Sequence, residues 1–135
     1  EALLACSRQV GQLVEFDVSS KATSKKGEVV KSPDFKAMGV SGLSLHFYPK
    51  GTEPGAKMCS LIVKARAGTR LRYKLFVDDA EKGATERFFD NADKGWGFST
   101  FCAVKESYSS VGMQIFQAAF SDPGASIEIA FEQNE

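Results

Sequence analysis

The sequence predicts an all-β fold: an antiparallel sandwich of seven or eight strands that follows one short N-terminal helix. Apolar and polar residues alternate with a period of two in several segments, as they do in half-buried strands. Turn-forming Gly, Pro, Asn and Asp residues separate these segments, and no strand–helix–strand alternation indicates a parallel sheet. The 135 residues suffice for one core, so we expect the helix at 1–13 and a single sandwich domain at 14–135.

The helix is predicted from the spacing of apolar residues near the start of the chain. Leu3, Cys6, Val10 and Leu13 recur at intervals of three, four and three residues, which is the spacing of a coiled-coil seam. The seam is shorter than the run of at least about three heptads over which a coiled coil is recognised. Two interpretations stand side by side: the end of an oligomerising coiled coil, or a short helix that packs on its own domain.

Five strands are predicted between residues 13 and 78. The clearest covers 41–48, where Leu43, Leu45 and Phe47 share one face and polar residues occupy the other. The remaining strands are expected at 13–18, 28–31, 58–64 and 69–78. Because only a short Gly-containing link joins the last two, we expect them to form an antiparallel hairpin.

The alternation of apolar and polar residues is weaker in the second half of the chain. Residues 79–85 are polar and predict a loop, and residues 105–112 are Ser-rich and predict a loop or a short helical turn. Between these loops, residues 96–104 form a mixed aromatic run. Residues 113–120 fit either a strand or a helix, and 126–132 alternate as a final half-buried strand.

Composition narrows the range of functions. The net charge is zero and 25% of the residues are charged, which argues against general binding to nucleic acid or to a membrane surface. No apolar run reaches the roughly 20 residues of a membrane-spanning helix. Cys6, Cys59 and Cys102 form no C-x-x-C pair, which argues against a zinc site. Cys59 and Cys102 lie in apolar runs, so we expect both to be small buried side chains in a reducing, cytoplasmic protein.

The sequence offers little for catalysis. His46 is the only histidine, so a Ser-His-Asp or Cys-His arrangement would depend on a residue predicted to lie on a surface strand. The chain lacks an H-E-x-x-H motif, a calcium-binding loop and a Gly-rich phosphate loop. We therefore predict no enzymatic activity, no metal site and no cofactor.

The middle of the chain carries a series of motifs in a distinctive order. Tyr-Pro-Lys-Gly at 48–51 ends a strand, Arg-Phe-Phe stands at 87–89, and Trp-Gly-Phe follows at 96–98. In order and spacing these motifs resemble the MATH domain, also called the TRAF-C or TRAF-like domain, over residues 14–131. The chain departs from the family pattern at Gly95, before the tryptophan, and in two earlier strands, so it resembles a divergent member.

The resemblance implies an eight-stranded antiparallel sandwich that binds short peptides. The peptide would lie extended beside an exposed strand edge, where backbone hydrogen bonds supply affinity and side-chain pockets supply specificity. Matched position by position, the peptide groove would comprise Ile62, Tyr73, Phe89, Lys94, Trp96 and Phe98. Structural alternatives exist: Tyr73 and the two phenylalanines would be core, Trp96 would seal the sandwich end, and Lys94 would be a solvated charge.

Three functions are compatible with the resemblance. The first is a peptide-binding module of an adaptor or scaffold, which binds a protein or peptide ligand and forms a homo-oligomer through its N-terminal helix. The second is a structural or oligomerisation domain without a peptide ligand. The third is a substrate-recognition domain excised from a ubiquitin-system enzyme. A carbohydrate-binding sandwich is a further rival, because aromatic platforms also stack on sugars.

Overall fold

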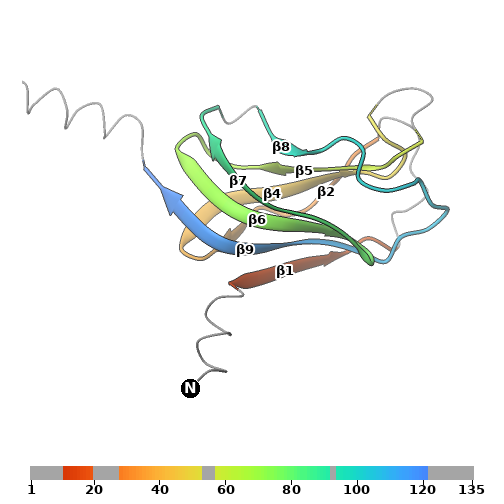
Figure 1. The fold of residues 1–135 in the computed structure, drawn as a ribbon, viewed down its shortest axis with the longest axis horizontal. Helices are drawn as coiled ribbons and strands as arrows, with labels where there is room; N and C mark the ends of the chain where they lie inside the picture. The colour runs from red at the N-terminus through yellow and green to blue at the C-terminus, as the bar shows by residue number, and fades with distance from the viewer. Residues whose placement is uncertain (1–10, 20–27, 53–56, 92–93, 122–135) are drawn as a thin grey trace, which may run out of the picture.

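The computed structural model describes residues 11–19, 28–52, 57–91 and 94–121. These residues form nine strands (Figure 1). The strands are β1 (Gln12–Asp17), β2 (Val30–Lys31), β3 (Phe35–Ala37), β4 (Val40–Tyr48), β5 (Ser60–Lys64), β6 (Thr69–Val77), β7 (Ala80–Phe89), β8 (Trp96–Phe98) and β9 (Ser110–Phe120). None of the described segments is a helix long and apolar enough to span a membrane.

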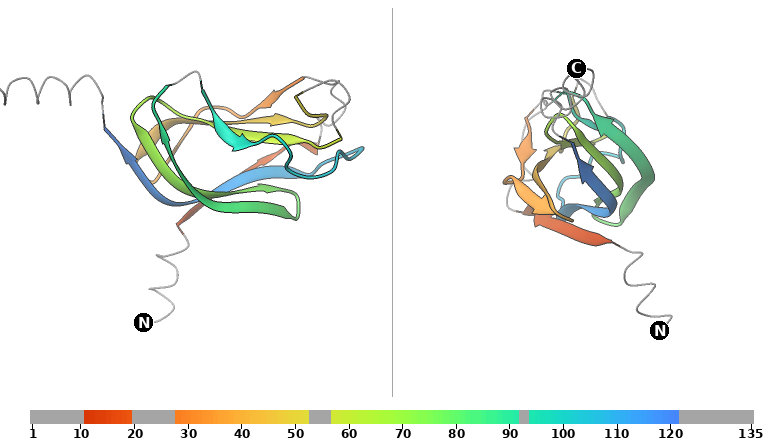
Figure 2. Two further views of the ribbon diagram at one scale, coloured as in Figure 1. Left: turned by 45° about the horizontal axis from the view of Figure 1, so that its top comes forward. Right: turned by 90° about the vertical axis from the view of Figure 1, so that its left-hand side faces the viewer.

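The nine strands form two antiparallel sheets. One sheet has the order β1-β9-β6-β7, and the other has the order β2-β4-β5-β8, with the short β3 paired to β4 beside it. Seen from the end, the strands of the two sheets curve around a common interior (Figure 2). The predicted all-β, antiparallel class is therefore confirmed.

A single hydrophobic cluster joins residues from both sheets. Strands β4 and β5 contribute Leu45, Phe47 and Leu61, and strands β6 and β9 contribute Leu75 and Met113, all at most 1% exposed. Burying each of these side chains stabilises the fold by about 1.5–3 kcal/mol. Period-two alternation places such residues on one face of each strand, so the sequence pattern specifies which face turns inward.

The predicted helix over 1–13 is wrong at its C-terminal end. Gln12 and Leu13 belong to β1, which pairs along its whole length with β9. Backbone hydrogen bonding to β9 outweighs the helical spacing of the apolar side chains, and Leu13 is 55% exposed on this strand. The other members of the predicted seam lie outside the described residues: Leu3, Cys6 and Val10.

The predicted hairpin between 58–64 and 69–78 is wrong, although both strands exist. Strand β5 pairs with β4 and β8, whereas β6 pairs with β7 and β9 in the other sheet. Residues 65–68 therefore carry the chain from one sheet to the other. The loop predicted at 79–85 is also wrong, because β7 begins at Ala80 and pairs with β6.

The alternation is confirmed elsewhere. Strands β1 and β4 match the strands predicted at 13–18 and 41–48 to within one residue at each end. The ambiguous segment 113–120 is extended and belongs to β9, which lies between β1 and β6. The strand predicted at 126–132 lies outside the described residues.

Candidate functional site

The rim at which β7 and β8 meet is the candidate functional site (Figure 1). Each of these strands is the last one in its sheet, so within the described residues each has one edge without a neighbouring strand. The two strands meet near Trp96, where the guanidinium of Arg87 on β7 lies 5.0 Å from the indole centroid. An open edge presents backbone N–H and C=O groups with which a further strand can pair.

Trp96 lies between two cations at this rim. The Lys94 ammonium is 4.9 Å from the indole centroid, and the Arg87 guanidinium is 5.0 Å from it. Both cations are exposed, whereas Trp96 is half-buried and packs against the core. A cation over an aromatic face stabilises an exposed site by about 0.5–1 kcal/mol. The two cations therefore stabilise the position of the indole, and they also present two positive charges to a ligand.

The glycines on either side of Trp96 let β8 approach β5 closely. A Cβ atom at Gly97 would overlap the backbone carbonyl oxygen of Leu61. A Cβ atom at Gly95 would overlap the Cγ2 atom of Ile62. Glycine is therefore needed at both positions for β8 to keep its place on the sheet.

The segment that follows β8 is fastened to the body of the protein. The Ser60 hydroxyl donates a hydrogen bond to the carbonyl oxygen of Ser99 at 2.7 Å. The rings of Phe98 and Phe101 meet edge to face with their centroids 6.0 Å apart, and Phe101 is 2% exposed. These contacts anchor the C-terminal end of β8 and keep its open edge in a fixed position.

The two faces of β8 offer different contacts. Gly97 lies opposite Ile62 on the outer face of the sheet, whereas Trp96 and Phe98 lie opposite buried residues of β5 and face inward. A strand added along β8 would alternate its side chains between these faces. One set would pass over the flat surface at Gly97 beside Ile62, and the other would meet Trp96 and its two cations.

The structure brings together only part of the predicted groove. Four of the predicted residues lie at or beside the rim: Ile62, Lys94, Trp96 and Phe98. The other two, Tyr73 and Phe89, are core residues that are 1% and 0% exposed. Burial raises the pKa of Tyr73 to about 12. A ligand at the surface would have to open the core to reach either ring.

Arg87 is a member of the site that the sequence did not predict. Within β7, Arg87 lies opposite Leu71 and faces the rim, whereas Phe88 lies opposite Arg70 on the outer face. Phe88 is 45% exposed, and its ring centroid is 5.3 Å from the Arg70 guanidinium. The available signal was alternation: Arg87 is two residues before Phe89, which is buried, so both share the inward side of an edge strand.

The only histidine lies on the outer face beside the site. His46 is opposite Ile62 in the register of β4 and β5. Partial burial, followed by the ammonium groups of Lys31 and Lys64, lowers the pKa of His46 from 6.5. The imidazole is therefore neutral at pH 7. The positive charge of the rim comes from Arg87 and Lys94.

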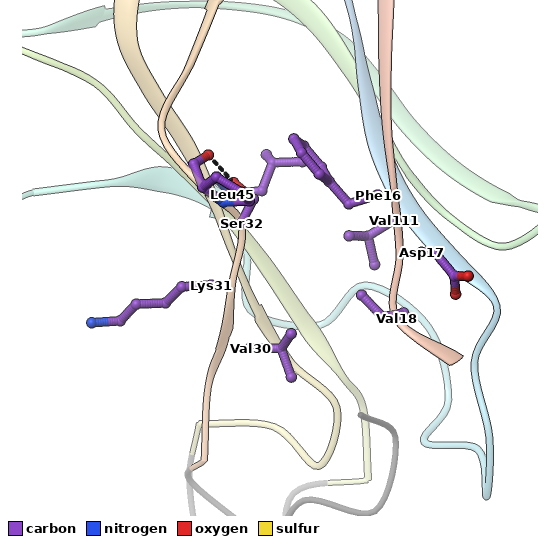
Figure 3. Close-up of a pocket in the computed structure, with 9 residues that line it drawn as sticks. Phe16, Asp17, Val18, Val30, Lys31, Ser32, Leu45 and Val111 are labelled. Carbon is purple, nitrogen blue, oxygen red and sulfur yellow. Dashed lines mark hydrogen bonds between the residues drawn. The ribbon is translucent and has the colours of Figure 1, made fainter. Parts of the chain in front are cut away.

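A small hollow lies on the rim opposite the candidate site, between β1 and β2 (Figure 3). Phe16, Leu45 and Val111 point into it, while the charged groups of Asp17 and Lys31 point away. Its volume is about 100 Å³. Pockets for small molecules usually measure about 300–1,000 Å³, so this hollow is too small to bind one.

Two further observations bear on function. Among residues 11–19, 28–52, 57–91 and 94–121, no three His, Cys, Asp or Glu side chains gather into a group that could hold a metal ion. No protein-family model matches the chain, and no curated protein matches it.

Proposed function

We propose that the chain is a peptide-binding module of the MATH, or TRAF-like, type that serves in a cytoplasmic adaptor or scaffold. The strand arrangement supports this assignment. Eight strands lie on two four-strand paths, β1-β9-β6-β7 and β2-β4-β5-β8, and β3 is a short addition to β4. Two such sheets around one core agree with the eight-stranded sandwich that the sequence resemblance implies.

The observation that carries the proposal is the open, uncharged edge of β8 beside Trp96. Strand β7 bears Glu81, Lys82, Glu86 and Arg87, and charged side chains on an edge strand discourage pairing. Strand β8 has the sequence Trp-Gly-Phe and carries no charge. An extended peptide would add to β8 through backbone hydrogen bonds, and Trp96 would supply the aromatic contact that concentrates binding energy.

The two cations give the proposed site a charge preference. A peptide side chain that faces the rim would meet the Arg87 guanidinium and the Lys94 ammonium. A guanidinium binds a carboxylate through two parallel hydrogen bonds, which adds specificity as well as affinity. We expect bound peptides to carry Asp or Glu at a position that faces the rim, next to an apolar residue that passes over Gly97.

Peptide display with matched variants tests the proposal. The wild-type chain, Trp96→Ala and Phe88→Ala would each be screened against one library of random peptides, and the enriched peptides would be measured by titration. Phe88→Ala is the control because Phe88 is also an aromatic with a cation over its ring, but it lies on the outer face of the other sheet. Melting curves would show that each variant folds.

We expect Trp96→Ala to weaken peptide binding by roughly 30-fold, since a central aromatic contact is worth about 2 kcal/mol. Phe88→Ala should bind like the wild type. Amide resonances of Trp96, Gly97 and Phe98 should shift on titration. Peptides that bind both variants equally, or shifts confined to another edge, would show that β8 is not the binding edge, and the absence of any enriched peptide would contradict the function itself.

An oligomerisation domain is the second candidate, and the exposed Leu13 supports it. Leu13 is 55% exposed on β1, whose outer edge has no neighbouring strand in the described part of the chain. A large apolar side chain beside an open edge favours contact between copies. Light scattering after size exclusion should then give a dimer or trimer for the wild type and a smaller mass for Leu13→Lys. Recognition of substrates for a ubiquitin-system enzyme would use the same β8 site.

A further inference from the structure

Two cysteines that are far apart in the sequence lie side by side in the fold. The Sγ atoms of Cys59 and Cys102 are 3.3 Å apart, across a sequence separation of 43 residues. Cys59 is fully buried just before β5, and Cys102 is half-buried in the segment after β8. Both thiols are free in this structure. The sequence predicts two separate, small, buried side chains, and only the fold brings them together.

Backbone hydrogen bonds hold the two cysteines side by side. Met58 and Ala103 form an isolated antiparallel bridge, and Cys59 and Cys102 are the residues next to it on the two segments. The Cys59 N–H donates to the Cys102 carbonyl oxygen at 2.8 Å, and the Phe101 N–H donates to the Cys59 carbonyl oxygen at 2.8 Å. These bonds join the two segments at the cysteines, whose Sγ atoms face each other at 3.3 Å.

We propose that Cys59 and Cys102 are a redox-active pair that forms an intramolecular disulfide when the chain meets an oxidising thiol couple such as glutathione and its disulfide. The Sγ atoms need to approach by little more than 1 Å to reach the bond length of about 2.05 Å. The Cys59 N–H to Cys102 carbonyl hydrogen bond already holds the two segments together at this point. Closure therefore needs a small movement of two side chains rather than a rearrangement of strands.

Thiol–disulfide exchange with oxidised glutathione supplies a balanced route. Cys102, the more accessible thiol, loses its proton, attacks one sulfur of glutathione disulfide and releases the first glutathione. The Cys59 sulfur then attacks Cys102 Sγ, forms the intramolecular bond and expels the second glutathione, which takes up the Cys59 proton. The two cysteines lose two electrons and two protons, and one glutathione disulfide becomes two glutathione thiols.

The environments of the two thiols assign their order of reaction. Burial, together with the hydrogen bond between its thiol and that of Cys102, raises the pKa of Cys59 to about 12. A thiol that stays protonated is a poor nucleophile towards a disulfide in solution. Cys59 therefore reacts second, when its partner sulfur is already adjacent and the step is intramolecular.

The bond would fasten a segment that supports the candidate peptide site. Cys102 follows Phe101, whose ring packs on Phe98 at the end of β8. Cys59 precedes Ser60, whose hydroxyl already holds the Ser99 carbonyl. Oxidation would replace the hydrogen bond between the two sulfur atoms with a covalent link, and it would close a long loop of the unfolded chain.

Mass spectrometry on a Cys6→Ser background tests the pair without interference from the third cysteine. The chain would be equilibrated in glutathione buffers of graded oxidised-to-reduced ratio, alkylated and digested with trypsin. Cys59 falls in the tryptic peptide 58–64 and Cys102 in 95–105. The matched control is Cys6→Ser with Cys102→Ser, which keeps the buried thiol and removes its partner.

We expect the two peptides to appear as one linked species, about 2 Da lighter than the sum of the free peptides. We also expect the melting temperature of the oxidised chain to rise by roughly 10 °C, as for a disulfide that closes a long loop. The control should show neither change. A glutathione adduct that persists on Cys102, or full alkylation of both thiols in the most oxidising buffer, would overturn the proposal.

Discussion

Asp78 ties three parts of the chain together, and its replacement tests how the β1-β9-β6-β7 sheet is held. It lies in the turn between β6 and β7 with a φ of 51°. Its Oδ1 atom accepts the N–H groups of Ser109 at 2.8 Å and Ser110 at 3.0 Å, and its Oδ2 atom accepts the Lys105 ammonium at 2.9 Å. Because the side chain is 14% exposed, water can replace these donors only in part.

We predict that Asp78→Ala lowers the free energy of unfolding by about 3–4 kcal/mol, because each hydrogen bond to a charged group contributes about 1.5 kcal/mol or more. The exposed ammonium of Lys105 adds little, but alanine is also strained at a left-handed φ, by about 1 kcal/mol. Asp78→Asn should lose only about 1–2 kcal/mol, since the amide oxygen still accepts both N–H groups and Asn tolerates this φ. Comparing the two variants separates the contribution of the carboxylate charge to stability from the contribution of its hydrogen-bonding geometry.

Urea unfolding followed by the fluorescence of Trp96, the only tryptophan, measures the effect. Asp79→Ala is the control, because Asp79 is the exposed neighbour in the same turn, and it should change stability by less than about 0.5 kcal/mol. A loss below about 1 kcal/mol for Asp78→Ala would show that the carboxylate does not hold β9 in place.

The same residue predicts a pH dependence. Burial opposes ionisation of Asp78, but the Ser110 N–H, the Lys105 ammonium and the Ser109 N–H outweigh it and lower the pKa from 3.8. A lowered carboxyl pKa contributes stability that is present above the unfolded-state value and lost as the pH falls through the folded value. The difference in stability between the wild type and Asp78→Asn should therefore be constant near pH 7 and shrink below pH 3.8.

Two further substitutions test the core and the edge strand. The Thr69 hydroxyl is buried and has no hydrogen-bond partner among the described residues. Thr69→Val should therefore raise the melting temperature by about 2–4 °C. A lower melting temperature would show that the hydroxyl does form a hydrogen bond. Gly97→Ala should push β8 away from the Leu61 carbonyl, because the added Cβ would overlap that oxygen. The fluorescence emission of Trp96 should then shift to longer wavelength, and peptide binding should be lost. An unchanged emission spectrum with normal binding would show that the close approach of β8 to β5 is not required.

Strands with one buried face could be predicted from the sequence, but their sheet membership could not. In β6, Leu71, Leu75 and Val77 are 0% exposed, and their period-two spacing is visible without a structure. The link at 65–68 between β5 and β6 is short and contains glycine, which suits a hairpin and a crossing between sheets equally well. The choice depends on how the distant β8 and β9 pair, and local patterns carry no information on that.

Strand β7 was mistaken for a loop because it is an edge strand. Solvated side chains cover both of its faces, and Phe89 is its one fully buried residue. Charged residues on both faces hide the alternation that would identify a strand. The site residues differ in the same way. Ile62 could be identified from the sequence because Ser60 and Lys64, which share its face of β5, are polar. The contact of Trp96 with Arg87 could not, because it arises only where the edges of two sheets meet.

The short edge of β8 limits the affinity with which a single proposed site can bind a peptide. Three residues expose few backbone groups, and each backbone hydrogen bond contributes only about 0.5–1.5 kcal/mol. Association itself costs at least about 4 kcal/mol, so most of the affinity must come from Trp96 and its cations, and one site should bind with a Kd of about micromolar or weaker. A ligand with repeated motifs would gain from several linked copies, because the second contact forms at a high effective concentration. The peptide site and the exposed Leu13 therefore need not be rival explanations: weak edge binding is most effective in a protein whose copies associate.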